Sequence, residues 1–404
     1  MAAMSPFLFV DWTCPSPYAS RTVLETALGG TEATVTRIAD ALDARVMQHN
    51  RKEAEGRYVP PASDKNVQHV VLLRDPRSMR DVRERFPAAQ LYLWMHDLVR
   101  PGSKRGRRVA ACARTLSELS VRVICVSQFQ RNGMVATLRE AGYPNVDVQT
   151  IYNPIDDALR PDGSEIDSNK LVFFSSPNKG LSYTLDAFQA LRRQMPELRL
   201  CIGNPGYKKL RRSNFDGVHW LGGLPHVNIL AEARTALCVF YPNFVLPETF
   251  GLVLAEANAV GTPVITHDCG AASEVLADSR QVLPILTQQR THERLSRWLP
   301  SPARPMLCRW SARRGAFAPY VERVQAWKAG ARPRTTADAR FKLSKIANEW
   351  RTLFDGAPAH SASDSSSRAA SMSSAAESSS AASLSSSDSS ATRAFLRDRG
   401  DFGR

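Results

Sequence analysis

Residues Pro247 to Pro263, PETFGLVLAEANAVGTP, constrain the fold of this chain more than any other stretch. Short apolar runs flank them, Ala236 to Tyr241 before and Pro263 to Thr266 after, and neither run carries a charge. Runs of this kind predict buried parallel strands. Leu252 to Val260, rich in Leu and Ala, predicts a helix between the two strands. The stretch is therefore expected to form one strand, loop, helix and strand unit of an open α/β sheet.

Two glutamates occupy positions in this unit where a ligand can bind. Glu248 falls on the loop at the carboxyl end of a predicted strand, which is the edge where open α/β sheets bind ligands. Glu256 comes eight residues later, on the helix. Gly251 lets the backbone turn closely into that helix, whose free N–H groups suit an anion. Two carboxylates around a helix N-terminus can hold hydroxyl groups next to a phosphate.

The spacing E-x7-E, followed by A-x-G-T-P-V-I, resembles the signature of the family-four glycosyltransferases, which have the two-domain GT-B fold. TFGLV follows the first glutamate, GTPVI follows the second, and GAASEV occupies Gly270 to Val275. An ordinary βαβ unit with two solvated glutamates would account for the spacing, but not for all three flanking motifs together. The resemblance extends from Phe7 to Phe354 and is tighter in the second half of that range.

The rest of the chain is consistent with an α/β fold, GT-B, with two Rossmann-like doubly wound domains that face a cleft. Short apolar runs alternate with helical patterns along most of the 404 residues, which predicts parallel sheets. Turn-forming residues between Asn153 and Ser168 mark a linker. The resemblance implies an acceptor-side domain over residues 1–160, a nucleotide-sugar-binding domain over 161–335, and a terminal helix over 336–355 that crosses back to the first domain. The Ser/Ala-rich C-terminal tail, 356–404, is expected to be disordered because it cannot bury a core.

The first domain has two candidate site features. Gly29 and Gly30 form a glycine turn that opens onto a predicted helix, where the backbone can approach a phosphate, although a plain tight turn is the simpler interpretation. His96 ends a predicted strand, where a histidine is by default a structural residue. The family resemblance places the glycine loop near the donor phosphates or the acceptor, and His96 near the donor sugar.

Lys179 is the main candidate in the second domain. It lies on a loop that enters a helix, where a flexible ammonium can reach a pyrophosphate, although most loop lysines are only solvated. Its position matches the family's donor-phosphate lysine. Many relatives also carry an arginine five residues earlier, where this chain has Phe174. Another cation must therefore help, or Lys179 acts with backbone donors alone.

Basic residues dominate the charge of the chain, which has a net charge of +14. This favours acidic partners such as nucleotide-sugar phosphates, anionic lipid headgroups or nucleic acid, and the charge alone does not choose among them. Arg100 to Arg108, RPGSKRGRR, is expected to be a loop that is either solvated or meets an anionic acceptor or a membrane surface. Lys208 to Arg212, KKLRR, could supply a cation to the site but is better explained as a surface patch. No specific nucleic acid partner is predicted.

Cysteine usage and hydropathy indicate a cytoplasmic protein, with peripheral membrane contact left open. The seven cysteines are scattered without a C-x-x-C motif, which is typical of a reducing compartment. Cys125, Cys201 and Cys238 fall inside predicted strands and are expected to be buried. The N-terminus has no basic leader, and no apolar stretch approaches the length of a membrane span.

The resemblance implies a metal-independent enzyme that transfers a hexose from a nucleotide diphosphate sugar to a hydroxyl of a glycan, lipid-linked or other acceptor, with retention of the anomeric configuration. The residues implied to be catalytic are His96, Lys179 and Glu248. Those implied to bind the donor are Gly29, Gly30, Lys179, Glu248, Phe250, Gly251, Leu252, Val253 and Glu256. Glu248 would hold hexose hydroxyls, Glu256 the ribose hydroxyls, and Lys179 the leaving diphosphate. No D-x-D metal motif occurs, so no metal and no cofactor beyond the donor substrate are expected.

Two other classes of function stay open. A dinucleotide-dependent α/β enzyme would also have doubly wound sheets, but no G-x-G-x-x-G follows a predicted strand. A non-catalytic polyanion-binding protein would use the basic surface, and it would neither bind nor hydrolyse sugar nucleotides.

Overall fold

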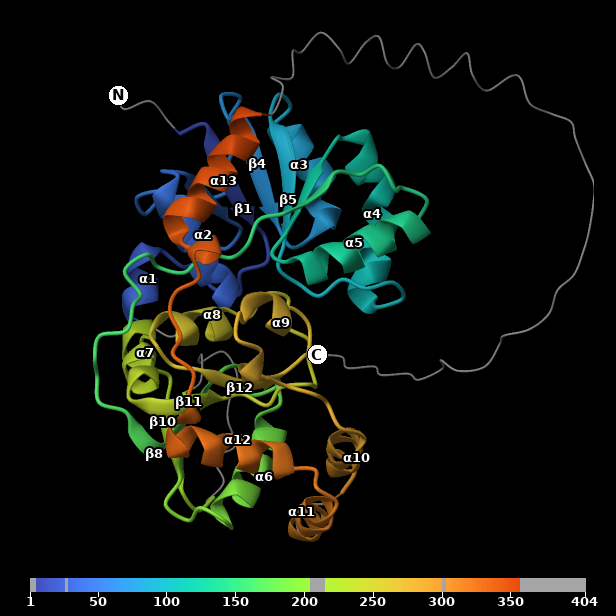
Figure 1. Cartoon of the computed structure of the whole chain (residues 1–404). Helices are drawn as coiled ribbons and strands as arrows, with labels where there is room; N and C mark the ends of the chain where they lie inside the picture. The colour runs from blue at the N-terminus through green and yellow to red at the C-terminus, as the bar shows by residue number, and fades with distance from the viewer. Residues whose placement is uncertain (1–4, 26–27, 204–214, 300–302, 357–404) are drawn as a thin grey trace, which may run out of the picture. The chain divides into compact units, whose positions relative to one another are not determined.

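The computed structural model describes residues 5–25, 28–203, 215–299 and 303–356 (Figure 1). These residues belong to one compact unit. The segment predicted to be disordered, 356–404, lies outside the described residues except for Gly356.

A parallel sheet of seven strands, in the order β3-β2-β1-β4-β5-β6-β7, forms the centre of the first domain. The strands are β1 (Phe7–Asp11), β2 (Arg45–Gln48), β3 (Tyr58–Val59), β4 (His69–Leu73), β5 (Gln90–Met95), β6 (Arg122–Cys125) and β7 (Val148–Thr150). The helices are α1 (Ser20–Glu25), α2 (Gly30–Ala41), η1 (Pro76–Ser78), α3 (Met79–Arg85), α4 (Lys104–Glu118) and α5 (Gln128–Glu140). The strand order reverses between β1 and β4, which makes that point the topological switch of the sheet.

Both faces of this sheet are buried, because successive side chains of a strand point to opposite faces. Phe9 of β1 belongs to a cluster that includes apolar residues of α2 and of the C-terminal helix α13 (Leu343–Asp355). Its neighbours Leu8 and Val10 belong to a second cluster, with residues of α3, α4 and α5. The sheet is therefore doubly wound, as the alternating pattern predicted.

The second domain repeats this plan with six parallel strands in the order β10-β9-β8-β11-β12-β13. The strands are β8 (Asp167–Phe174), β9 (Arg199–Gly203), β10 (Val218–Gly222), β11 (Ala236–Phe240), β12 (Val264–His267) and β13 (Val282–Leu283). The helices are α6 (Leu181–Arg192), α7 (His226–Arg234), α8 (Leu252–Ala259), α9 (Ala272–Val275), η2 (Ser279–Gln281), α10 (Thr287–Ser296), α11 (Arg304–Arg313), α12 (Ala318–Ala326), η4 (Trp327–Ala331) and η5 (Ala339–Phe341). The predicted fold class, two doubly wound α/β domains, is confirmed.

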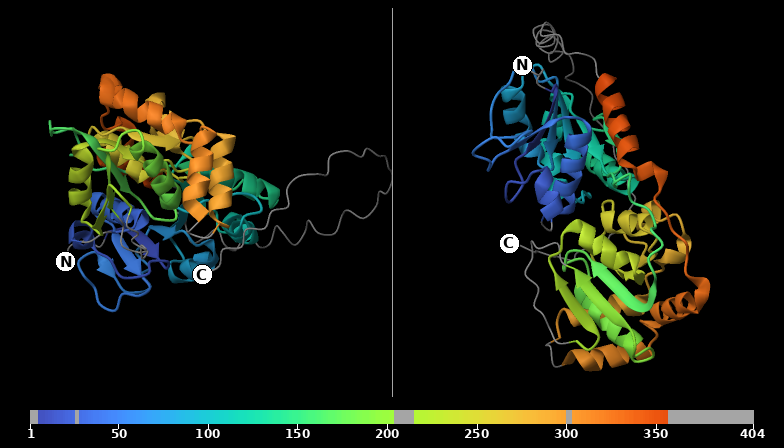
Figure 2. Two further views of the ribbon diagram at one scale, coloured as in Figure 1. Left: turned by 90° about the horizontal axis from the view of Figure 1, so that it is seen from below. Right: turned by 90° about the vertical axis from the view of Figure 1, so that its left-hand side faces the viewer.

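The C-terminal helix α13 packs on the first domain, although it follows the second domain in sequence (Figure 2). Trp350 meets Trp94 of β5 with ring centroids 4.9 Å apart, and Phe354 stacks on Phe7 of β1 at 4.7 Å. The segment that leads to α13 runs beside the linker between the domains, because the Ile155 carbonyl accepts a hydrogen bond from Leu343 N. The chain thus passes between its two domains twice at the same place.

Two further contacts join the domains. Glu274 of α9 accepts hydrogen bonds from the backbone N–H groups of Gln128 and Phe129, at 2.7 and 3.1 Å, in the first turn of α5. The hydroxyl of Thr249 donates to the carbonyl oxygen of His96 at 3.0 Å. A carboxylate at a helix N-terminus satisfies free N–H groups and interacts favourably with the helix dipole.

The structure corrects the interpretation of Arg100 to Arg108. Only the first part is a loop, because α4 begins at Lys104. Ser103 is the N-cap, and its hydroxyl accepts a hydrogen bond from Gly106 N at 3.0 Å. The glycines and charges of this segment favoured a loop in the sequence analysis, although the helix begins within it.

The region from Arg290 to Arg314, which shows no clear hydrophobic period, contains most of α10 and all of α11. Their buried positions include the polar residues Gln289, His292 and Ser311, and this explains why hydrophobic periodicity missed both helices. The predicted burial of cysteines in strands is confirmed, since Cys125, Cys201 and Cys238 are free and buried in β6, β9 and β11. Among the described residues, no helix combines the length and the apolar character that crossing a membrane requires.

The packing of α13 makes a testable prediction. Trp350 is fully buried, so Trp350→Ala should leave a cavity and lower the free energy of unfolding by about 3–5 kcal/mol. Urea denaturation followed by circular dichroism measures this, with Lys345→Ala on the exposed side of the same helix as the control. A loss below about 1 kcal/mol for Trp350→Ala would show that α13 contributes little to the first domain.

Candidate active site

A cavity of about 520 Å³ lies between the carboxyl ends of the two sheets. From the first domain it is lined by Gly30, Arg37, Arg74, His96, Asp97 and Arg105, among others. From the second domain its lining includes Phe174, Lys179, His226, Glu248, Phe250, Gly251, Leu252, Val253 and Glu256. Open α/β sheets bind ligands at this edge. Most of the residues predicted from sequence therefore converge on one space.

Glu248 lies on the loop after β11 and is only 4% exposed. Its carboxylate accepts two hydrogen bonds from the Lys179 ammonium, at 2.7 and 2.9 Å, and one from the Tyr241 hydroxyl. Gly270 crosses directly behind it, with a positive φ of 81°, and a side chain there would collide with the Glu248 backbone. The close approach of these two loops, which only glycine permits, fixes the carboxylate against the cavity.

Lys179 lies on the loop between β8 and α6. Its backbone N–H donates to Ser176 O at 2.9 Å, and Gly180 follows in the left-handed conformation as the N-cap of α6. In this structure the ammonium is engaged by Glu248. The Phe174 side chain, at the position where many relatives carry arginine, lines the same cavity and offers no charge.

Glu256 projects from α8 and is held by an arginine and a histidine. Arg37 of α2, in the first domain, forms an ion pair with it at 3.0 Å, and His226 of α7 lies 3.0 Å from its other oxygen. Burial raises the pKa of Glu256, but the charges of His226 and Arg37 outweigh burial and lower it to about 2. Glu256 is therefore ionised at neutral pH, and its pair with Arg37 joins the two domains across the cavity.

His96 is buried at the end of β5. Burial, reinforced by the charge of Arg74, lowers the pKa of His96 to about 3, so its imidazole is neutral at neutral pH. The ring lies beside Trp94, with centroids 4.6 Å apart and ring planes tilted by 53°. Its Nε2 atom has no hydrogen-bond partner among the described residues. This imidazole can therefore serve as a hydrogen-bonding group for a ligand hydroxyl.

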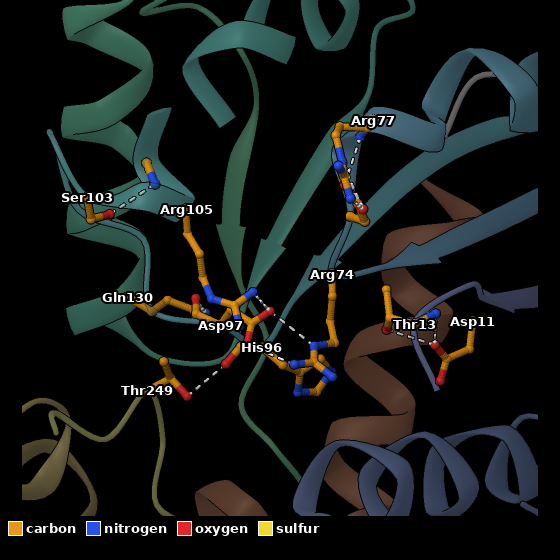
Figure 3. A network of polar contacts seen from close by, with 12 residues as sticks. Asp11, Thr13, Arg74, Arg77, His96, Asp97, Ser103, Arg105, Gln130 and Thr249 are labelled. Atoms are coloured by element: carbon orange, nitrogen blue, oxygen red, sulfur yellow. Dashed lines mark hydrogen bonds and ion pairs between the residues drawn. The ribbon is translucent and has the colours of Figure 1, made fainter. Parts of the chain in front are cut away.

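A polar network next to His96 stiffens this part of the first domain (Figure 3). The Asp97 carboxylate accepts two hydrogen bonds from Arg74, at 3.0 and 3.1 Å, and one from Arg105 at 2.5 Å. Gln130 of α5 donates to the Asp97 carbonyl at 2.7 Å. Arg74 has a positive φ of 65°, which is unusual for a residue with a side chain and costs conformational energy. The network holds the turn after β5, and with it His96, in one position.

The predicted glycine positions differ in their surroundings. Gly29 is the N-cap of α2 and does not line the cavity, since the Glu32 carboxylate occupies the space beside its Cα. Gly30 does line it, and a side chain there would touch Leu252 of the second domain. Gly251 caps α8 with φ of 97°, a conformation that favours glycine.

Sequence reasoning missed three polar residues of the site, Arg37, Arg74 and His226. Arg37 lies seven residues after Gly30, or about two helical turns, so a helix that starts at Gly30 presents both residues on one side. That spacing could have identified Arg37. The other two follow from long-range packing and leave no local signal. The alternative cations Lys208 and Lys209 lie outside the described residues.

One group of potential metal ligands occurs in the described part of the chain, away from the cavity. The ligand atoms of Asp186, His292 and Cys308 lie within 4.8 Å of one another, and all three residues are buried. Arg304 forms an ion pair with Asp186 at 2.9 Å. A guanidinium at this position opposes a second cation, so the group is better described as a buried polar network.

Comparison with known proteins agrees with this geometry. Residues 161–313 match the family model of Glycosyl transferases group 1. A phosphatidyl-myo-inositol mannosyltransferase of Mycobacterium leprae is 34% identical over 109 residues, which are 26% of this chain and 29% of that protein. A D-inositol 3-phosphate glycosyltransferase of Jonesia denitrificans is 30% identical over 161 residues, which are 35% of this chain and 38% of that protein. The matches to these curated relatives thus span less than half of the relatives' length.

Solved structures extend the likeness to most of the fold. Sucrose-phosphate synthase from Thermosynechococcus elongatus aligns with a TM-score of 0.55 and 17% identity, over 87% of this chain and 99% of that one. Anabaena HepE in complex with UDP-glucose aligns with a TM-score of 0.52 and 15% identity, over 87% and 99%. Two doubly wound domains with a cavity between their carboxyl edges define the GT-B class. Over residues 161–313 the chain is similar to the Glycosyl transferases group 1 family, and its fold is that of the GT-B class.

The charge of Glu256 predicts a pH dependence of stability. Its folded pKa of about 2 lies below the ordinary value of 4.5, so the ionised carboxylate stabilises the folded protein above pH 4.5. This contribution, on the order of 3 kcal/mol, should be lost as the pH falls toward 2. Glu256→Gln should lower the free energy of unfolding at pH 7 and converge with the wild type in acid.

Urea denaturation at about five pH values between pH 7 and pH 2.5 measures the difference in free energy of unfolding between Glu256→Gln and the wild type. Glu118→Gln is the matched control, because Glu118 pairs with Arg80 and Arg114 at an exposed position, where solvent screens the charges and the substitution should change stability little. An unchanged difference between Glu256→Gln and the wild type at all pH values would contradict the assignment.

Proposed function

We propose that this protein transfers a hexose from a nucleotide diphosphate sugar to a hydroxyl acceptor. The observation that carries the proposal is the set of charged groups that line one cavity, namely the carboxylates of Glu256 and Glu248 and the ammonium of Lys179. A nucleotide sugar has hydroxyls at its ribose, a diphosphate in the middle and hydroxyls at its hexose. The names of the relatives, a mannosyltransferase and a glycosyltransferase, support the same reaction class.

In this proposal Glu256 binds the ribose. An ionised carboxylate only accepts hydrogen bonds and can take both ribose hydroxyls at once. Arg37 and His226 keep it ionised in a buried place, as its low pKa indicates. The donor enters a site whose ribose acceptor is already charged and oriented, so less ordering is needed on binding.

Glu248 and Lys179 then exchange partners. Glu248 accepts hydrogen bonds from hexose hydroxyls, and the Lys179 ammonium turns toward the leaving diphosphate. The N–H groups of Phe250 to Val253, at the start of α8, add to the stabilisation of that negative charge. Lys179 is the single lysine that lines the described cavity, and Phe174 supplies no help. The departing phosphate should therefore depend strongly on this one ammonium.

We propose retention of configuration by a same-face reaction. The bond between the anomeric carbon and the diphosphate oxygen breaks, the acceptor oxygen bonds to the same face, and the leaving phosphate takes the acceptor's proton. No protein base is required, which suits a neutral His96 that donates or accepts a hydrogen bond at a sugar hydroxyl. The charge that the diphosphate gains is stabilised by Lys179 and backbone N–H groups, and we propose that no metal is needed.

The acceptor is proposed to be a hydroxyl on a glycan, a lipid-linked molecule or another polyol. Both relatives carry inositol in their names, one as phosphatidyl-myo-inositol and the other as D-inositol 3-phosphate. Inositol and its phosphate esters are therefore the first acceptors to test.

The decisive experiment screens nucleotide sugars for thermal stabilisation and slow hydrolysis, with and without EDTA. One donor should raise the melting temperature and be hydrolysed at an unchanged rate in EDTA. Proton NMR of the transfer product then gives the anomeric configuration. Binding of polyanions without any response to nucleotide sugars would overturn the proposed function. An inverted product would overturn the mechanism while leaving the reaction class intact.

Two substitutions separate the roles of Lys179 and Glu256. Lys179→Ala should lower kcat on the order of 10²–10³-fold, since a charge needed mainly in the transition state is removed. It should weaken binding of the nucleoside diphosphate but not of the nucleoside. Glu256→Ala should weaken both equally, by about 1.5–3 kcal/mol, because the ribose is common to them.

Calorimetric titration with nucleoside and nucleoside diphosphate makes this comparison. Lys179→Arg serves as the control that keeps a cation beside Glu248. If Lys179→Ala leaves diphosphate affinity and kcat near wild type, the lysine only supports Glu248. The phosphate contact must then come from another cavity-lining cation, such as Arg105.

A further inference from the structure

Exposed apolar side chains concentrate on α10, on the turn that follows it and on α11. Five of the eight large apolar side chains that are exposed in the described chain lie between residues 295 and 310. They are Leu295, Trp298, Leu299, Met306 and Trp310, which together we call the hairpin patch. Trp298 is 87% exposed and Met306 is 73% exposed. Large apolar groups gathered on one surface indicate an interaction site, whereas single ones do not.

Positive charge surrounds this patch. The segment from Thr287 to Arg314 contains seven arginines and one acidic residue, Glu293, which gives a net charge of +6. Glu293 is already paired with Arg297 at 2.5 Å. The exposed arginines of this segment are Arg290, Arg294, Arg297, Arg309, Arg313 and Arg314. Apart from Arg297, these exposed arginines form no ion pair with a carboxylate among the described residues.

The two kinds of side chain share the outer side of α11. Leu307, Cys308 and Ser311 are its buried positions. Met306 and Trp310 are four residues apart and exposed, so they lie one above the other on the opposite side. Arg314 stacks over the Trp310 ring at 4.5 Å, which holds that indole at the surface beside a guanidinium.

The inner side of α10 and α11 already packs against α6. The exposed apolar residues are therefore not the residues that attach these helices to the domain. His292 of α10 is completely buried and bridges Asp186 of α6, at 3.1 Å, and Ser311 of α11, at 2.8 Å. Arg304, at the start of α11, donates to the same Asp186 at 2.9 Å. One polar network therefore fixes both helices to α6. The two helices also pack against each other (Figures 1 and 2).

We propose that the hairpin patch docks the protein on an anionic phospholipid surface. Indole and thioether groups enter the boundary between headgroups and acyl chains, and arginines beside them bind lipid phosphates. An apolar contact and a basic rim supply the two signals that reversible membrane binding requires. None of the hairpin patch residues lines the cavity, so this surface is separate from the proposed catalytic site.

Charge argues against a second copy of this chain as the occupant. In a symmetric dimer the same patch appears on both subunits, which would bring the arginine rims against each other. Like charges across an interface are unfavourable. A bilayer that contains anionic lipid offers negative charge over the whole contact, which this uniformly basic rim matches.

The experiment is co-sedimentation of the full chain with vesicles of phosphatidylcholine, alone or with added phosphatidylglycerol. The wild type should bind the anionic vesicles in a salt-sensitive way and the neutral ones weakly. The double variant Arg309→Gln/Arg313→Gln should bind anionic vesicles on the order of 20-fold more weakly. Trp298→Ser/Met306→Ser should lose binding even at low salt, because the apolar contact is gone.

The control is Arg80→Gln/Arg114→Gln, which removes the same charge from exposed positions on the first domain. It should bind like the wild type. Equal binding by both arginine double variants would show that only net charge matters and would overturn the proposal. So would a wild type that ignores anionic vesicles, or that forms a dimer in light scattering which Trp298→Ser abolishes. Unchanged nucleotide-sugar hydrolysis in the hairpin variants keeps this test independent of the proposed catalytic function.

Discussion

The ion pair between Arg37 and Glu256 is the interaction on which the arrangement of the site depends. It connects α2 of the first domain to α8 of the second, and it is nearly buried on both sides. A buried carboxylate without partners would take up a proton. Because Arg37 and His226 prevent this, α8 can bring a permanent negative charge to the wall of the cavity. The two domains thus share one charge pair at the wall of the cavity.

Rigid loops complete this arrangement on either side. In the second domain, Gly270 lets its backbone pass behind Glu248 at a distance that no other residue permits. In the first domain, Asp97 gathers Arg74 and Arg105 and keeps His96 at the edge of the cavity. The hydroxyl of Thr249 then reaches across to the His96 carbonyl. These contacts fix the backbone around Glu248 and His96.

Much of the fold, and the position of the two glutamates, could be predicted from the sequence, because buried parallel strands are short, continuous apolar runs. The strand Gln90–Met95 and the unit that carries Glu248 and Glu256 belong to this kind. Other helices could not be predicted because polar residues occupy their buried positions. His292 and Ser311 point inward on α10 and α11, so these helices have no apolar stripe to recognise. The contacts of Glu256 were missed for a different reason, because the spacing from Gly30 could place Arg37 on the cavity side of α2 but no local pattern shows that Arg37 and His226 meet Glu256.

The position of α13 has a consequence for how the chain is made. The face of the first sheet that includes Phe7 and Trp94 is covered by Trp350 and Phe354. A ribosome synthesises the sheet first and these two residues only after the whole second domain. Until then, an aromatic surface of the first domain stays open to water, and to neighbouring chains during translation. The domain that is translated first is therefore the last to be completed.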